Sequence, residues 1–301
     1  MRIWKAIAGT LMALSGLATV TAVRAETVNC TAITNAAIPY TISAPGVYCV
    51  TEKITTNLAT GAAIIIDANN VVLDLNGFAI GNLGAGAATG AVGVYALDRQ
   101  NIWLRNGILR GFSLGVALLE GTSVGLTTAN SSGHMVSNII ADHCYAVGIA
   151  VQGPYAVVKN SAVYSATGSN NATGGNTSAI SVDDAPGGIV SDNDVLDTDC
   201  SNACPAATAQ AIGIEIGSSP GSLVSNNRIT NSAMPTITRS AAIAVDKTDT
   251  NILLVGNVMA NWATGITFSS LASGKYRFNG FIGGVTTNVT GASGVDAGDN
   301  Y

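Results

Sequence analysis

The sequence predicts an all-β protein whose short strands wind into a parallel β-helix, a solenoid of about eight coils with an N-terminal cap. Three observations lead to this fold class. The chain is 48% hydrophobic but only 10% charged and 5% aromatic, and it holds 35 glycines. Asparagines that end short apolar segments recur every 22 to 34 residues along most of the chain. The residues before each of these segments alternate between apolar and polar or small, the period-two pattern of a strand buried on one face.

The N-terminal residues 1–25 are predicted to be a signal peptide. Arg2 and Lys5 precede an apolar stretch without charge, and Val23-Arg24-Ala25 offers acceptable residues for cleavage. The alternative is a membrane anchor, but the stretch 6–22 is short for a span of about 20 residues and rich in Ala, Gly and Thr. We therefore expect a secreted or periplasmic protein without a membrane span in the mature chain.

The charge balance of the mature chain excludes a class of partners. Cleavage removes three of the 13 basic side chains (13 − 3 = 10) and none of the 18 acidic ones, so the net charge becomes 10 − 18 = −8. Phosphate binding needs clustered Lys and Arg, so nucleic acid is not an expected partner. The same balance disfavours unaided binding of polyanionic glycans.

All five cysteines follow the predicted cleavage site and so enter an oxidising compartment. Their spacing predicts two disulfides, Cys30 with Cys49 and Cys200 with Cys204. Cys144 is left over and is expected to be a small buried side chain. His134 and His143 are the only histidines, and neither lies in a zinc-binding spacing.

After the signal peptide, residues 26–61 are expected to form an N-terminal cap and edge strand, and residues 62–301 the β-helix domain. The strand that comes first in each coil is predicted to point two residues inward: Ile64/Ile66, Val92/Val94, Val116/Leu118, Ile149/Val151, Ile180/Val182, Ile212/Ile214, Ile243/Val245 and Ile266/Phe268. The second segment of each coil ends at a marker asparagine: Asn76, Asn106, Asn138, Asn160, Asn193, Asn227, Asn257 and Asn279. Asparagine suits this corner because it tolerates a left-handed backbone and because its amide can bond to the same residue one coil away.

The segments NNVVLDLNGFAI (69–80) and NIWLRNGILRGFSLGV (101–116) resemble repeats of the pectin-lyase-like superfamily, and the resemblance extends over residues 62–284. It implies a right-handed β-helix and a polysaccharide as the substrate class, with lyase or glycoside hydrolase activity if the protein is an enzyme. The catalytic motifs match poorly. Asp183-Asp184 matches the DD motif of polygalacturonase-like members, whereas Ser132-Gly133-His134-Met135 departs from their GHG motif and their RIK motif is missing. This departure puts catalysis in doubt.

A first candidate site follows from the outward residue after each inward pair. The predicted column reads Asp67, Tyr95, Leu119, Gln152, Asp183, Glu215, Asp246 and Ser269. Asp183, Glu215 and Asp246 would lie one coil apart, at about 5 Å, where like charges raise a carboxyl pKa or recruit a cation such as calcium. These acids, together with Asp197, are our candidates for catalysis. The alternative is that each Asp merely closes a turn by bonding nearby backbone N–H groups.

A second candidate column lies about four residues beyond each marker: Ile80, Arg110, Asp142, Tyr164, Asp197, Asn231, Asn261 and Gly283. Arg110, Asp142, His143 and Tyr164 are predicted to bind substrate. Three long insertions, 121–133, 165–177 and 199–210, are expected at the same corner as this column, so that both columns would flank one groove.

Two functions remain open from the sequence. In the first, the exported protein binds or processes a polysaccharide or cell-surface glycan in that groove, with calcium as a candidate cofactor. In the second, it is a non-catalytic surface or periplasmic solenoid, an adhesin or a structural module. The second is favoured by the missing motifs and by Trp103 and Trp262, which are expected to point outward but too far apart to form one sugar-stacking platform.

Overall fold

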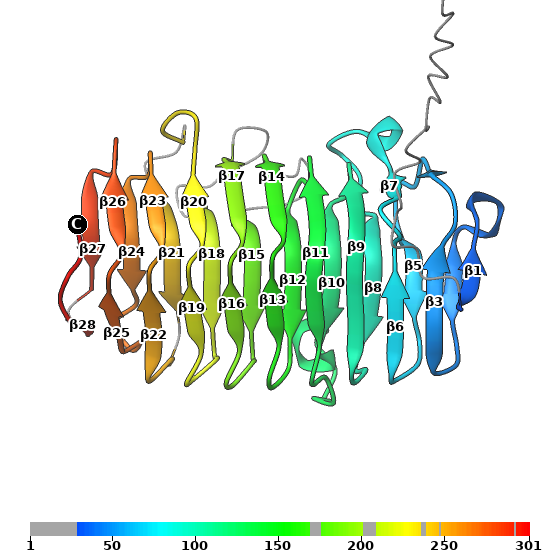
Figure 1. Ribbon diagram of the computed structural model, residues 1–301, viewed down its shortest axis with the longest axis horizontal. Helices are drawn as coiled ribbons and strands as arrows, with labels where there is room; N and C mark the ends of the chain where they lie inside the picture. The colour runs from blue at the N-terminus through cyan, green and yellow to red at the C-terminus, as the bar shows by residue number, and fades with distance from the viewer. Residues whose placement is uncertain (1–28, 169–175, 201–208, 236–238, 247, 292) are drawn as a thin grey trace, which may run out of the picture.

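The computed structural model describes residues 29–168, 176–200, 209–235, 239–246, 248–291 and 293–301, and the predicted signal peptide lies outside them. Within these residues the chain is a right-handed parallel β-helix with two sheets on opposite sides of a rod (Figure 1). Three short 3-10 helices interrupt it: η1 (Asn35–Ala37), η2 (Leu83–Ala85) and η3 (Gly121–Val124). None of the described helices has the length and apolarity to cross a bilayer.

The sheet that faces the viewer in Figure 1, here called the front sheet, has 18 strands. They are β1 (Thr31–Ile33), β3 (Gly46–Val50), β4 (Ile54–Thr55), β6 (Val71–Asp74), β7 (Ala79–Gly81), β9 (Ile102–Arg110), β11 (Met135–Asp142), β13 (Val157–Lys159), β14 (Ala162–Ala166), β16 (Ile189–Ser191), β17 (Asp194–Thr198), β19 (Leu223–Ser225), β20 (Arg228–Thr230), β22 (Ile252–Val255), β23 (Val258–Ala260), β25 (Gly274–Arg277), β26 (Gly280–Ile282) and β28 (Gly294–Asp296). A corner in each coil divides this sheet into a lower half, which includes β6, β13 and β16, and an upper half, which includes β7, β14 and β17; β9 and β11 run through both (Figure 1).

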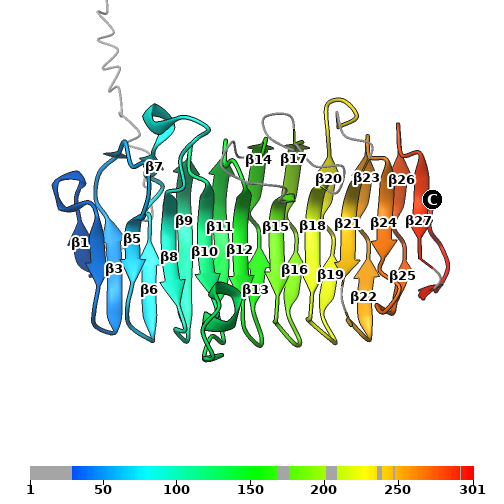
Figure 2. The same ribbon diagram turned by 180° about the vertical axis from the view of Figure 1, so that it is seen from behind.

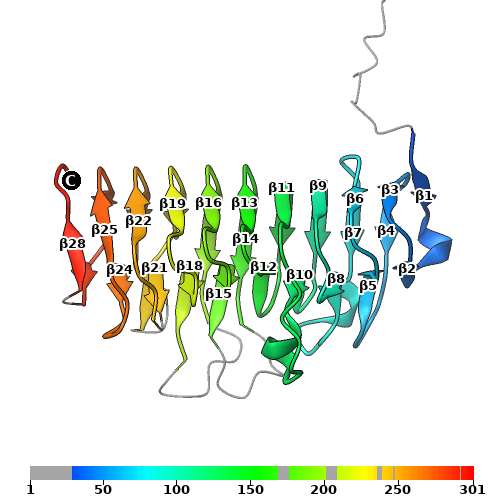
Figure 3. The ribbon, with the colours of Figure 1, turned by 90° about the horizontal axis from the view of Figure 1, so that it is seen from below.

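The back sheet, which comes to the front in Figure 2, has ten strands. They are β2 (Tyr40–Ile42), β5 (Ala62–Ile66), β8 (Val92–Leu97), β10 (Leu114–Leu119), β12 (Val147–Gln152), β15 (Thr177–Asp183), β18 (Ala211–Gly217), β21 (Ser240–Asp246), β24 (Thr264–Phe268) and β27 (Thr287–Thr290). Seen from below, the strands of successive coils form two rows along the rod (Figure 3). The segment expected to be the cap supplies β1–β4. β1 pairs with β3, and β2, β3 and β4 pair with the coil strands β5, β6 and β7; the role of this segment as a cap stays a prediction.

The core of the back sheet is a column of apolar side chains from successive coils. One fully buried row runs Ile64, Val94, Val116, Ile149, Ile180, Ile214, Ile243 and Ile266. Six of the eight predicted inward pairs are therefore confirmed, and two are wrong by two residues. Val94 and Ala96 point inward in place of Val92, and Ile214 and Ile216 do so in place of Ile212. Apolar residues continue to alternate through both segments, so the pattern fits the predicted pair and the pair two residues later equally well.

Four marker asparagines form a hydrogen-bonded ladder inside the rod. The side-chain Nδ2 of Asn193 donates to Oδ1 of Asn227 at 3.0 Å, Asn227 donates to Asn257 at 2.9 Å, and Asn257 donates to Asn279 at 3.0 Å. The Asn279 amide donates in turn to Oδ1 of Asn300 at 3.3 Å. Each of the four is at most 2% exposed, and its amide also donates to a backbone carbonyl. The expected bonding between coils is confirmed here.

The other four markers serve the corner itself. Asn76, Asn106, Asn138 and Asn160 have φ between 49° and 58°, the left-handed region that asparagine tolerates. In the later coils this conformation belongs to the preceding residue, for example Asp192 or Asn226, and the marker has moved inward. Asn106 and Asn138 combine both reasons, because the Asn138 amide also donates to Oδ1 of Asn106 one coil away, at 3.3 Å. In the later coils the two reasons hold for adjacent residues.

The predicted disulfide between Cys30 and Cys49 is present, with Cα atoms 5.8 Å apart. It joins the first strands of the front sheet. Cys204 lies outside the described residues, so its pairing with Cys200 stays a prediction. Cys144 is a free, buried thiol, as expected, and burial raises its pKa to about 12. A thiol with that pKa is not a nucleophile at neutral pH.

Candidate functional site

The predicted column of three acids does not form. Asp183 pairs with Gly217, and Gly217 pairs with Asp246, so these two acids are two coil steps apart, about 10 Å. Glu215 lies two residues earlier in its strand, level with Ser181 and Ala244. The error follows from choosing Ile212 as the inward residue of its coil.

Two of these acids, Glu215 and Asp183, have local roles in the structure. Glu215 accepts a hydrogen bond from the Ser178 hydroxyl at 2.7 Å on the outer face of the back sheet. Asp183 accepts from the backbone N–H of Asp184 at 3.1 Å, which is turn chemistry. Among the described residues, no three His, Cys, Asp or Glu side chains are grouped so that they could hold a metal ion. The expected calcium site at Asp183, Glu215 and Asp246 therefore lacks geometric support.

The second candidate column forms over three coils. Arg110, Asp142 and Tyr164 are register partners on β9, β11 and β14. The Arg110 Nε lies 2.8 Å from one Asp142 carboxylate oxygen, and the His143 Nδ1 lies 2.5 Å from the other. Arg110 and His143 are each 46% exposed and Asp142 is 19% exposed. We call these residues, with Tyr164, the upper-edge cluster.

Asp197 lies one residue beyond this column, where Leu196 is the register partner of Tyr164. Its carboxylate accepts hydrogen bonds from the backbone N–H and the hydroxyl of Ser232, both at 2.6 Å. Asp197 and Ser165, the residue after Tyr164, line the same pocket. The pocket is otherwise lined by Thr167, Thr198, Asp199, Asn231, Ser232, Ala233 and Met234. The predicted binding residues thus continue into a mostly polar pocket along the upper edge.

The two candidate columns do not flank one groove. Asp183 and Asp246 end strands of the back sheet, whereas Arg110, Asp142 and Tyr164 lie on the front sheet, on the other side of the rod (Figures 1 and 2). The insertions are also divided. The loop 121–133 leads from β10 down into β11, and the insertions that start at 165 and 199 lead from the upper half of the front sheet into the back sheet. The insertions therefore do not meet at one corner.

A carboxyl group that the sequence analysis did not select lies at the start of the loop 121–133. Glu120 is 6% exposed, and burial raises its pKa, as do the nearby carboxylates of Asp184, Asp98 and Asp183. Asp98 fixes the loop by accepting from the backbone N–H of Gly121 at 2.7 Å and from the Thr128 hydroxyl. A raised pKa keeps a carboxyl protonated up to a higher pH than an ordinary carboxyl, which favours proton donation. The sequence signal for Glu120 was an acidic residue directly after a buried apolar strand. The alternation of apolar and polar residues alone does not single out such a position.

His134 belongs to a buried hydrogen-bond chain. Its Nδ1 accepts from the Ile102 backbone N–H at 3.3 Å, so its Nε2 carries the proton toward the Ser131 hydroxyl at 2.7 Å. Ser131 in turn donates to the Gln152 carbonyl at 3.1 Å. The side chain is 1% exposed, and burial lowers its pKa to about 4. The imidazole is therefore neutral and structural.

We expect this histidine to make the protein less stable in mild acid. Its pKa is about 4 in the folded protein and about 6.5 in the unfolded chain, so the unfolded chain binds more protons between these pH values. The contribution is fully present above pH 6.5 and falls by up to about 3 kcal/mol as the pH approaches 4. Urea unfolding of the wild type and of His134→Gln at pH 7, 5.5 and 4.5 measures it. Equal losses of unfolding free energy in both proteins would contradict the assignment.

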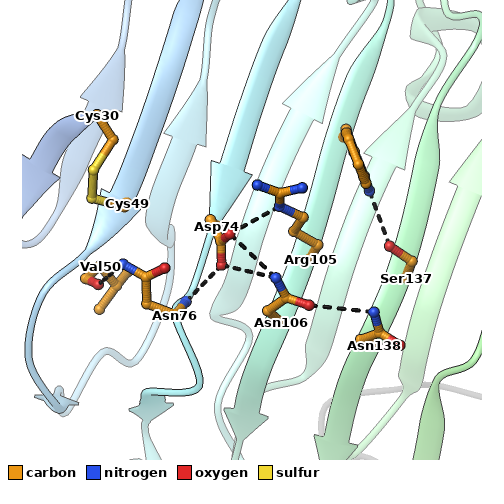
Figure 4. Close-up of polar contacts among 10 residues, drawn as sticks. Cys30, Cys49, Val50, Asp74, Asn76, Arg105, Asn106, Ser137 and Asn138 are labelled. Carbon is orange, nitrogen blue, oxygen red and sulfur yellow. Dashed lines mark hydrogen bonds and ion pairs between the residues drawn. A yellow bond between two sulfur atoms is a disulfide. The ribbon is translucent and has the colours of Figure 1, made fainter. Parts of the chain in front are cut away.

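The lower half of the front sheet carries a second polar network (Figure 4). Asp74, which is 1% exposed, accepts from Arg105 Nε at 2.9 Å and from the Asn106 amide at 3.2 Å. The Arg105 guanidinium lies 4.4 Å from the centroid of the Trp103 ring, and the indole N–H donates to the Ser137 hydroxyl at 2.9 Å. Trp103 is thus held on the outer face, as expected.

The expectation for Trp262 is wrong. Its side chain is fully buried, and its indole N–H donates to the Ile229 carbonyl at 3.1 Å. A tryptophan can enter a narrow core when its single donor finds a carbonyl, and the sequence does not show that partner.

Comparisons with known proteins bear on the fold. No protein-family model and no curated protein matches the chain. Among solved structures, the enzymatically active domain of tailspike protein 2 from bacteriophage CBA120 has a TM-score of 0.57 at 13% identity, covering 88% of this chain and 43% of that one. Full-length tailspike protein 2, described from an Escherichia coli O157:H7 bacteriophage, has a TM-score of 0.56 at 14% identity, covering 88% and 38%. Pectate lyase Pel9A has a TM-score of 0.47 at 14% identity, covering 85% and 69%.

This chain spans about two fifths of the length of the two tailspike chains. At 13 and 14% identity the likeness concerns the fold, a parallel β-helix, and not the activity.

Proposed function

We propose that this β-helix is exported and binds an extracellular polysaccharide on the upper half of the front sheet. The observation that carries the proposal is the upper-edge cluster, in which Asp142 holds both Arg110 and His143 on the surface of a rigid sheet. Sites on strands are more precise than sites on loops, because neighbouring coils fix each side chain. The Cys30–Cys49 disulfide and the resemblance to pectin-lyase-like repeats both suit an exported, carbohydrate-related protein.

The chemistry of the cluster suits sugar hydroxyl groups. Such groups donate and accept hydrogen bonds, and the cluster offers the guanidinium donors of Arg110, the imidazole of His143 and the Tyr164 hydroxyl. The adjacent pocket adds the Asp197 carboxylate. The excess of acidic over basic side chains in the chain (18 against 13) favours a neutral glycan.

Replacing Asp142 with asparagine is expected to weaken glycan binding about tenfold, which corresponds to about 1.4 kcal/mol, because Arg110 and His143 lose the charge that orients them. Affinity gel electrophoresis against a panel of neutral and acidic polysaccharides measures the change. Asp194→Asn is the matched control, since Asp194 pairs with Arg228 on the same half of the sheet, with Nε to Oδ1 at 2.9 Å, but outside the cluster. Equal loss in both variants, or none in either, would overturn the site.

The same panel separates binding from processing. New reducing ends or unsaturated products would add cleavage to binding. The substitutions Asp183→Asn, Glu215→Gln, Asp246→Asn and Asp197→Asn, with calcium or a chelator, test the four acids first selected. Binding without product in either channel would leave a carbohydrate-binding solenoid or adhesin.

A further inference from the structure

The lower half of the front sheet carries an unbroken row of large apolar side chains on its outer face. Register pairing links one residue from each of eight successive coils: Val47, Val72, Trp103, Met135, Val157, Ile189, Leu223 and Leu253. Val47, Trp103, Ile189 and Leu253 are 37–38% exposed, whereas the residue that follows each of them in its strand is buried. We call this row the apolar stripe.

The stripe is long and regular. Seven steps of about 4.8 Å make it roughly 34 Å long, and the strands that carry it are nearly parallel from end to end (Figure 1). Trp103 satisfies its own polar atom on Ser137, so only its ring adds to the stripe. Long contiguous rows of exposed apolar side chains are uncommon on soluble monomers, and where they occur they mark interaction surfaces.

We infer that a second copy of this chain packs against the apolar stripe, with the two rods antiparallel. The first argument is the spacing: a row with one side chain per coil is matched over its whole length only by a surface with the same period, and another copy of the rod has it.

The direction follows from charge. The stripe continues into Lys275, the register partner of Leu253. In a parallel pair this ammonium would face its own copy, which is unfavourable. In an antiparallel pair centred between Met135 and Val157, Trp103 faces Ile189 of the other copy, and Lys275 lies beyond Val47.

The adjoining polar column fits the same arrangement. It runs Asp74, Arg105, Ser137, Lys159, Ser191 and Ser225 along the coils. Asp74, Ser137 and Ser225 are buried within the rod, so the charges of this column that reach the surface are Arg105 and Lys159. Reversed on the partner, the column sets Arg105 opposite Ser191 and Lys159 opposite Ser137, so that no like charges meet. The upper-edge cluster lies on the other half of the sheet, and so the pairing does not depend on the proposed glycan site.

Sedimentation velocity over a concentration series tests the pairing. The wild type is expected to be a dimer, and Ile189→Lys is expected to raise its dissociation constant at least tenfold, because it buries an unpaired charge at the interface. Leu271→Lys is the control, since Leu271 is 68% exposed but lies outside the stripe. A wild type that stays monomeric, or an Ile189→Lys variant that dimerises like the control, overturns the inference.

Cross-linking tests the direction and does not depend on a charged variant that folds. Trp103 and Ile189 lie three coils apart in one chain, about 14 Å, which is too far for a disulfide within the chain. The double variant Trp103→Cys/Ile189→Cys is therefore expected to form a covalent dimer on oxidation, whereas Ile189→Cys alone is not. A dimer from Ile189→Cys alone would show parallel rods and overturn the antiparallel arrangement.

Discussion

Replacing Asn227 with alanine is expected to lower the free energy of unfolding by about 3–5 kcal/mol, because several buried groups lose their partners at once. The Asn227 side chain accepts from both the backbone N–H and the amide of Asn193, each at 3.0 Å. It donates to the Val190 carbonyl at 3.0 Å and to the Asn257 amide oxygen at 2.9 Å. No water can reach these groups easily, because Asn227 is 1% exposed.

The neighbouring residue provides the control. Asn226 is exposed, has φ 56°, and contacts only Asp192 by a weak bond of 3.5 Å. Asn226→Ala should cost only about 1 kcal/mol, the strain of alanine in the left-handed region, and Asn226→Gly should cost less. Urea unfolding followed by far-UV circular dichroism compares the three variants, with an expected Tm loss of roughly 10 °C for Asn227→Ala. Similar losses at positions 226 and 227 would mean that the ladder adds no stability beyond the corner.

The second large effect is expected at Gly148. A Cβ atom there would lie 2.5 Å from a methyl group of Val163 and 2.6 Å from the Ala179 carbonyl oxygen, inside the core between coils. Because a backbone carbonyl cannot yield without moving its strand, Gly148→Ala should cost about 3 kcal/mol by overpacking. The change is measured by thermal and urea unfolding of purified protein.

Gly90→Ala controls for the loss of glycine itself. The nearest atom to a Cβ on Gly90 is the Ala59 carbonyl oxygen at 3.8 Å, which is ordinary contact, and its backbone is not in the left-handed region. This variant should stay within about 0.5 kcal/mol of the wild type or gain slightly. If Gly148→Ala unfolded at the same urea concentration as Gly90→Ala, the coils would be looser than the structure shows.

The fold was predictable because it repeats. The spacing of the asparagines and the alternation before them appear in every coil, so that an error in one coil does not hide the pattern. What the repeat could not determine was the frame within a coil. Ile212, Ile214 and Ile216 alternate without a break, and choosing the first of them moved Glu215 into a column with Asp183 and Asp246 that does not exist. A frame error of two residues in a single strand therefore produced a column of three acids that the structure does not contain.

The upper-edge cluster was predictable for the opposite reason. Arg110 and Asp142 follow their marker asparagines at the same distance, so counting from Asn106 and Asn138 gives the correct register. Glu120 and the loop that Asp98 fixes could not be found this way, because the loop breaks the repeat and its contacts join residues 23 and 30 positions apart. Likewise, the apolar stripe is visible only when the register of all coils is known.

The asparagine ladder also has a direction. Every amide from Asn193 to Asn279 donates toward the C-terminal end and accepts from the N-terminal end, and Asn300 closes the series. A coil copied from this region brings one donor and one acceptor in the correct sense, and it can be inserted between any two of its neighbours without leaving an amide of the ladder unpaired. Coils from the N-terminal half, which have Gly77 or Ile139 after the marker, lack this property. The rod can therefore lengthen by duplication of single coils in its C-terminal half, where each new unit restores the same junction on both sides.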